Sequence, residues 1–108
     1  MKKYKVRITK DAEQDLLDLY YYIAKYDDEE NALSMLDKLE ELITSLDQNL
    51  NRGHIPPELD QQGIKDYKEV HYKPYRIIYE IIGSEVVILC CVDGRREMKA
   101  LLERRLFR

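Results

Sequence analysis

The sequence has no apolar run of about 18 residues, the length that a membrane-spanning helix requires. Its first ten residues, MKKYKVRITK, contain no apolar segment of the kind found in a secretory signal. We therefore expect a cytoplasmic protein with no membrane partner. The sequence also lacks internal repeats and low-complexity segments, and its 108 residues suit one domain. We expect that domain to span residues 1–108.

Cysteine is scarce, since the chain contains only Cys90 and its neighbour Cys91. Both lie in an apolar segment with the character of a strand, where successive side chains take opposite faces. Two such cysteines do not pair easily with each other, a pattern that fits a reducing compartment. We interpret them as small buried side chains rather than reactive thiols.

The signatures of several enzyme classes are missing. The sequence contains no phosphate-binding loop, no dinucleotide fingerprint and no motif centred on a serine nucleophile. His54 lies in a proline-containing segment, and no cysteine or carboxylate stands at ligand spacing from it. We therefore expect neither a metal site nor a cofactor.

Charge is distributed unevenly along the chain. Residues 11–47 contain twelve acids against two lysines, a local balance of −10, whereas the whole chain carries −3. The remaining residues therefore carry +7. Either the basic part faces an anionic partner, or the charges lie on solvated faces and happen to segregate.

The segment Tyr67–Arg96 predicts three adjacent strands. Residues alternate between Pro74 and Ile82, Gly83 and Ser84 suit a two-residue hairpin turn, and the run VVILCCV is typical of a central strand. With such a turn, Tyr75 pairs near Val92 and Arg76 pairs near Cys91. One face is then apolar and the other carries Arg76 and Glu80. The apolar face contains Tyr75, Ile77, Tyr79, Ile81, Val86, Ile88, Cys90 and Val92.

Two amphipathic helices are predicted before these strands. Asp11 and Gln14 have the spacing of a capping box for the first, and the acidic residues 27–30 separate it from the second. The second helix should be the longest element and should end near Arg52 and Gly53. Residues 54–66 predict a surface loop.

An edge strand and a final helix complete the pattern. Lys3–Thr9 alternates as a half-buried strand with lysines that protect a sheet edge. From Glu97 a helix carries an apolar stripe of Met98, Leu101, Leu102 and Leu106, surrounded by Lys99, Arg104, Arg105 and Arg108. The predicted fold is α+β with the order β-α-α-β-β-β-α. A small antiparallel sheet carries a helical hairpin on one face and a C-terminal helix.

The sequences YKEVHYKPYRIIYEI and VVILCCVDGRREMKALLERRL resemble the RelE/ParE superfamily of toxins from type II toxin-antitoxin systems. ITKDAEQDLLDLYYYI and the long helix after it match the same pattern, so the resemblance covers nearly the whole chain. Its most specific parts are the Pro-Tyr-Arg-Ile-Ile-Tyr strand and the Asp-Gly-Arg-Arg strand end. The resemblance implies a RelE/ParE-like toxin domain that inhibits growth, contributes to plasmid stabilization and forms a hetero-oligomer with a cognate antitoxin.

Two targets follow from the resemblance. RelE-like members are mRNA interferases that cleave ribosome-bound mRNA, and ParE-like members poison DNA gyrase. Cleavage requires proton-transfer groups and cations that stabilise the charge on phosphorus. The resemblance assigns such roles to Arg76, Arg96 and Lys68. Val70 stands where a second lysine is expected, and Leu102 stands where those nucleases have a tyrosine. The missing tyrosine and the acidic helices slightly favour the gyrase poison, with the endonuclease as the alternative.

His71 is a further catalytic candidate if the chain is a nuclease. With a two-residue loop at Lys73 and Pro74, it would lie opposite Arg76 and could act as an acid or base. Proline is unfavourable at the third position of the commonest turn, so this register stays open. Arg76 could instead pair with Glu80, two positions along the same face.

The C-terminal part supplies candidates for binding the target or the antitoxin. Guanidinium groups bind phosphate in a forked geometry and also bind acidic side chains. A small sheet leaves part of the apolar stripe exposed, which would favour contact with an antitoxin segment. The candidates are Arg95, Arg96, Met98, Leu101, Leu102, Arg104 and Arg105.

Overall fold

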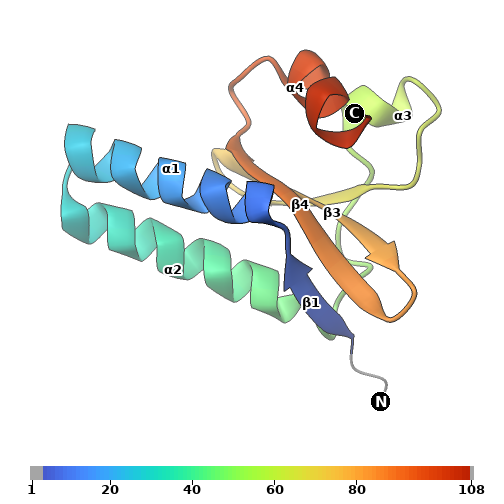
Figure 1. The fold of residues 1–108 in the computed structure, drawn as a ribbon, viewed down its shortest axis with the longest axis horizontal. Coiled ribbons are helices and arrows are strands. Elements are labelled where there is room, and N and C mark those ends of the chain that lie inside the picture. The colour runs from blue at the N-terminus through green and yellow to red at the C-terminus, as the bar shows by residue number, and fades with distance from the viewer. Residues whose placement is uncertain (1–3, 108) are drawn as a thin grey trace.

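The computed structural model describes residues 4–107, which form four strands, three longer helices and one short helix (Figure 1). Lys3 of the predicted first strand and Arg108 lie outside the described residues. Within them, the predicted order of elements is confirmed, with the short helix α3 inserted in the expected loop. The elements are β1 (Lys5–Ile8), α1 (Lys10–Tyr26), α2 (Glu29–Ser45), α3 (Pro57–Asp60), β2 (Lys68–Tyr72), β3 (Tyr75–Ile82), β4 (Glu85–Asp93) and α4 (Met98–Leu106).

The sheet has the strand order β1-β4-β3-β2. Strand β3 is antiparallel to both β2 and β4, as predicted, but β1 runs parallel to β4. The sheet is therefore mixed rather than wholly antiparallel. A parallel partner requires a crossover connection, and the α1–α2 hairpin lies in that connection.

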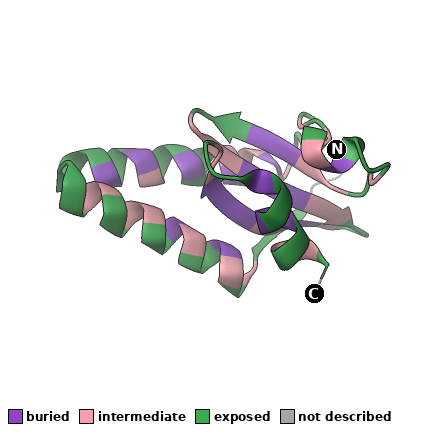
Figure 2. Cartoon of the chain, turned by 90° about the horizontal axis from the view of Figure 1, so that it is seen from above, coloured by how far each residue is buried: buried purple, intermediate pink, exposed green. Residues whose placement is uncertain are grey.

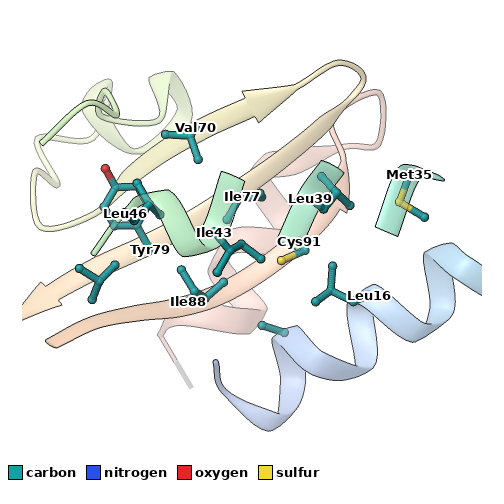
Figure 3. Close-up of a cluster of buried hydrophobic side chains, with 12 residues drawn as sticks. Leu16, Met35, Leu39, Ile43, Leu46, Val70, Ile77, Tyr79, Ile88 and Cys91 are labelled. Atoms are coloured by element: carbon teal, nitrogen blue, oxygen red, sulfur yellow. The ribbon is translucent and has the colours of Figure 1, made fainter. Parts of the chain in front are cut away.

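Each face of the sheet is covered by a separate core. The helical hairpin packs on one face through residues such as Leu16, Leu39 and Ile43, which meet Ile77 and Ile88 (Figure 3). Helices α3 and α4 lie on the other face (Figure 1). Figure 2 shows buried residues along the strands, while the outer surfaces of α1 and α2 are largely exposed. Strand β4 is thus buried on both faces, as its apolar sequence predicts.

A β-bulge in β4 changes the predicted register. Near the Gly83–Ser84 turn Ile82 pairs with Glu85 as expected, but the register shifts between Ile78 and Tyr79, where Leu89 is the extra residue. Beyond it Tyr75 pairs with Asp93 rather than Val92. Arg76 likewise pairs with Val92 rather than Cys91.

The bulge also reverses the predicted faces of the last part of β4. Cys91 joins the core under the hairpin, whereas Cys90 and Val92 join the core under α4. Both cysteines are buried and unpaired, as predicted. Burial raises the pKa of the Cys90 thiol to about 12 and also raises the pKa of Cys91.

The helix boundaries differ from the predicted ones at two points. Thr9 caps α1, because its hydroxyl accepts from the Ala12 N–H at 3.1 Å and donates to the Ile88 carbonyl at 3.0 Å. The predicted capping box at Asp11 is therefore wrong. Asp28 caps α2 by accepting from the Asn31 N–H, in the acidic segment predicted to separate the helices.

Helix α2 ends at Ser45 and not near Gly53, and with 17 residues it equals α1 in length. The chain then turns under Tyr79, whose hydroxyl donates to the Leu50 carbonyl at 2.7 Å and accepts from the Gly53 N–H at 3.2 Å. A Cβ on Gly53 would lie 2.6 Å from that hydroxyl, so the close approach requires glycine. None of the helices in residues 4–107 is long and apolar enough to cross a membrane.

Candidate functional site

Arg76 on β3 is held by two carboxylates and not by Glu80. Its Nη1 and Nη2 atoms donate to the two oxygens of Glu58 on α3, at 2.9 and 2.7 Å. Its Nε donates to Glu69 Oε1 on β2 at 2.6 Å. The Arg76 side chain is 12% exposed and that of Glu69 is 1% exposed. The Nε atom and the fork of Nη1 and Nη2 are therefore directed at protein carboxylates.

The strand register places this cluster. His71 pairs with Arg76 across β2 and β3, so the loop at Lys73 and Pro74 has two residues, the alternative that places His71 opposite Arg76. The Lys73–Pro74 peptide is cis, the form that proline takes at the third position of a tight turn. Glu69 and His71 are two residues apart on β2 and therefore share the face that carries Arg76.

His54 does not lie alone, contrary to the prediction. It forms an isolated bridge with Glu69, in which His54 N donates to Glu69 O at 3.1 Å and Glu69 N donates to His54 O at 2.7 Å. The His54 Nε2 atom lies 2.9 Å from Glu69 Oε2, and the His71 Nε2 atom lies 3.2 Å from the same oxygen. Two imidazoles and a guanidinium thus surround one buried carboxylate.

Hydrogen bonding favours the charged forms of Glu58 and Arg76. Hydrogen bonds from Arg76 lower the pKa of Glu58, and the hydrogen bonds to Glu58 and Glu69 raise the pKa of Arg76.

Gly94 packs directly against the side chain of Arg76, since a Cβ on Gly94 would lie 2.5 Å from Arg76 Cδ. Glycine in the Asp-Gly-Arg-Arg segment is therefore required by the packing of Arg76.

The residues predicted for nuclease activity are divided between different parts of the molecule. Lys68 and Val70 lie on the sheet face under the helical hairpin, because they alternate with Glu69 and His71. Arg96 borders a pocket of about 280 Å³ formed with α1 residues, whereas Arg76 and His71 border another of about 240 Å³. Only Arg76 and His71 of this predicted catalytic set are brought together.

Leu102 is fully buried in the core under α4. A side chain at this position points into the protein and cannot contact a substrate at the surface. Met98 and Leu101 are 4% and 3% exposed, packed in the same core with Leu59. The predicted exposed apolar stripe on α4 is therefore absent, because α3 and the sheet cover it.

The basic residues near the C-terminal helix have different roles. Arg95 donates to both oxygens of Asp93, which lowers the pKa of that carboxyl, and its own side chain remains 76% exposed. Arg96 and Arg104 are exposed at the surface. Arg105 is instead an internal contact, as its 18% side-chain exposure indicates.

Arg105 connects α4, α1 and the β4 bulge. Its Nη1 and Nη2 atoms donate to the Asp15 carboxylate at 3.1 and 2.9 Å, and Nη2 also donates to the Leu89 carbonyl at 2.9 Å. The same carboxylate accepts from the Cys91 N–H at 3.0 Å. The guanidinium and carboxylate thus satisfy backbone groups beside the bulge, so Arg105 has a structural role.

Sequence reasoning did not identify Glu58, Glu69 or His54 as members of the cluster. Glu58 follows Pro56–Pro57, and proline at the start of a helix is a recognised signal that could have indicated α3. Glu69 shares the alternation of His71, which was available from the sequence. The bridge of His54 to Glu69 spans a segment with no periodic pattern, so no local signal predicts it.

The mixed sheet, the α1–α2 hairpin and the C-terminal helix define the fold of RelE- and ParE-type toxins. The chain matches the chromosomal ParDE toxin-antitoxin system from P. aeruginosa with a TM-score of 0.72 and 20% identity, over 86% of this chain and 98% of that one. It matches the RelBE2 toxin-antitoxin complex from Mycobacterium tuberculosis with a TM-score of 0.63 and 22% identity, over 84% and 98%. For the YoeB dimer from Staphylococcus aureus the TM-score is 0.55 and the identity 22%, over 83% and 95%.

The family follows from the sequence itself. The sequence model of the ParE toxin of type II toxin-antitoxin system, parDE, matches residues 6–98. This chain therefore belongs to the ParE toxin family of type II toxin-antitoxin systems. A comparison with curated proteins finds no significant match.

Proposed function

We propose that this chain is a toxin that inhibits growth by poisoning DNA gyrase and is neutralised by a cognate antitoxin. The observation that carries the choice of target is the state of Arg76. Glu58 occupies the fork of Nη1 and Nη2 that would bind a phosphate, and Glu69 accepts from Nε. A nuclease of this superfamily requires a cation at the scissile phosphate.

The remaining catalytic positions support the same choice. Leu102 cannot exchange a proton and is buried, Lys68 lies on the opposite face of the sheet from Arg76, and Arg96 borders a different pocket. General acid and base groups contribute about 10²- to 10⁴-fold each to such reactions. A toxin that acts by binding gyrase needs no such groups. It needs only a surface that holds the enzyme in one state. The exposed Arg95, Arg96 and Arg104 are our candidates for contacting the target or the antitoxin.

Two purified systems test the proposal. The chain is incubated with gyrase and supercoiled DNA, and separately with ribosomes translating a defined mRNA. We expect protein-linked DNA breaks in the first system and intact mRNA in the second. The product of the neighbouring gene should suppress the breaks and should co-purify with the chain.

Matched variants locate the contact surface. Arg96→Ala should reduce the number of DNA breaks by about tenfold or more, since one charge-assisted contact contributes about 1.5 to 3 kcal/mol. Lys38→Ala, which removes an exposed cation from α2, should leave the breaks unchanged. Cuts at specific codons of the mRNA, lost on His71→Ala, would reject gyrase as the target and identify the endonuclease.

A further inference from the structure

The cluster around Glu69 contains three groups that can bind a metal ion. His54 Nε2, His71 Nε2 and a Glu69 carboxylate oxygen all lie within 4.8 Å of one another. The two imidazole nitrogens are 2.9 and 3.2 Å from the same atom, Glu69 Oε2. Around a tetrahedral Zn²⁺ with bonds near 2.0 to 2.1 Å, ligand atoms lie about 3.3 Å apart. Small side-chain rotations would therefore admit an ion between the three groups.

With neutral imidazoles, the form that binds a metal ion, the cluster carries a net negative charge. Glu58 and Glu69 contribute two negative charges, and Arg76 contributes one positive charge. Glu69 is 1% exposed, so water screens its carboxylate poorly. A divalent cation bound to Oε2 would offset the remaining negative charge.

Neighbouring residues hold the side chains of His54, Glu69 and His71 in place, as residues around a bound metal ion hold its ligands. Oε1 of Glu69 accepts from Arg76 Nε, which leaves Oε2 directed toward the two imidazoles. Hydrogen bonds of this kind orient a ligating carboxylate. Backbone pairing fixes the ligands as well, through the His54–Glu69 bridge and the pairing of His71 with Arg76.

The site is also open to an incoming ion. The His54 and His71 side chains are 55% and 40% exposed, so the buried carboxylate forms the floor and the imidazoles form the rim. Three protein ligands leave a fourth position for water. Two imidazoles and one carboxylate suit Zn²⁺ and related transition metals, whereas Mg²⁺ and Ca²⁺ prefer oxygen ligands alone.

We propose that His54, Glu69 and His71 form a binding site for one divalent transition-metal ion of the Zn²⁺ type. The ion would join the segment before α3 to the edge strand β2 beside Arg76. It would therefore stabilise the folded chain, because it binds the assembled ligands and not the unfolded ones. This role is independent of the target of the toxin.

The test uses the full chain without a polyhistidine tag, since a tag would itself bind the metal. Zn²⁺, Co²⁺ and Mg²⁺ are titrated by calorimetry, and thermal unfolding is followed with Zn²⁺ and with a chelator. We expect one Zn²⁺ per chain, a higher Tm in Zn²⁺ that the chelator reverses, and no response to Mg²⁺. Zn²⁺ that fails to bind or to raise the Tm would overturn the proposal.

Glutamine variants separate metal binding from a purely structural role. His54→Gln and His71→Gln each keep a side-chain N–H that can donate to Glu69 but remove a metal ligand. Each should weaken Zn²⁺ binding by about tenfold or more, since even changes in supporting groups cost about 10- to 100-fold. Glu40→Gln, which removes an exposed carboxylate from α2, should bind Zn²⁺ like the wild type.

Persistent one-to-one binding in the double variant His54→Gln/His71→Gln would place the metal elsewhere and overturn the site. If either variant does not fold, the visible absorption of Co²⁺ bound to the wild type decides the question. Bands of a four-coordinate complex with nitrogen and oxygen ligands support the site. A spectrum identical to that of aqueous Co²⁺ rejects it.

Discussion

Arg76 holds one positive charge between two carboxylates, of which Glu69 is almost completely removed from water. A buried charge pair contributes little net stability compared with apolar residues, but removing one partner leaves the other charge uncompensated. Arg76, to which the resemblance assigns a catalytic role, therefore has a structural role in this chain.

Replacing Arg76 with alanine should lower the free energy of unfolding by about 3 to 5 kcal/mol, the usual cost of breaking a buried pair. Urea unfolding at pH 7 measures this change. Arg95→Ala is the control, because its side chain is 76% exposed and an exposed ion pair contributes only about 1 kcal/mol or less. An Arg76→Ala protein as stable as Arg95→Ala would contradict the structural role.

The position of Arg76 was predictable, but its partners were not. Strand alternation gives the face of Arg76, whereas the pairing of Arg76 with His71 was one of the registers that the sequence left open. Glu58 is 18 residues away in a segment expected to be a loop. Long-range pairs of this kind depend on how α3 packs under α4, which local periodicity does not describe.

At the level of elements, the β4 bulge determines which side chains face which core. A strand reverses its faces when one residue is added, so Leu89 moves Cys90 and Val92 to the face opposite the one that strict alternation predicts. The run VVILCCV is apolar on both faces, so its pattern contains no signal for the extra residue. The existence of β4 was therefore predictable, and its register was not.

Arg105 stabilises this bulge from α4, so its loss should affect three elements together. Arg105→Ala removes hydrogen bonds to Asp15 and Leu89, and a charge-assisted bond contributes about 1.5 to 3 kcal/mol. We expect a loss of about 2 to 3 kcal/mol in unfolding free energy. Denaturant titration provides the measurement.

Arg104→Ala is the matched control, since Arg104 is the adjacent exposed arginine on the same helix. Its effect should stay within about 0.5 kcal/mol, as for most surface substitutions. If Arg104→Ala and Arg105→Ala destabilise the chain equally, Arg105 does not support the bulge.

Within residues 4–107, part of the basic charge outside residues 11–47 is paired with carboxylates. Arg7, Arg76, Arg95 and Arg105 each contact a carboxylate. The hairpin formed by α1 and α2 contains most of the acidic residues. The two least exposed of these arginines, Arg76 and Arg105, are therefore not available to a basic face that binds an anionic partner.

Affinity for nucleic acid tests this conclusion, since phosphate binding depends on exposed cations and decreases with salt. A fluorescent single-stranded RNA, followed by anisotropy near physiological salt, should show no binding at low micromolar concentrations of the chain. An Asp27→Lys/Asp28→Lys variant reverses part of the acidic charge at the hairpin tip and should increase the anisotropy. Tight binding by the wild type, weakened steeply by added salt, would restore the basic face as an RNA-binding surface.

The parallel pairing of β1 with β4 has a consequence for the order in which the protein is made. Lys5 pairs with Glu85, and the Thr9 cap of α1 is hydrogen-bonded to Ile88. Both helices of the hairpin therefore leave the ribosome well before the strand that covers them. Contacts so distant in sequence form late and slow folding. A chain whose synthesis stops before β4 cannot assemble either core, so toxicity is confined to molecules in which β4 has been made.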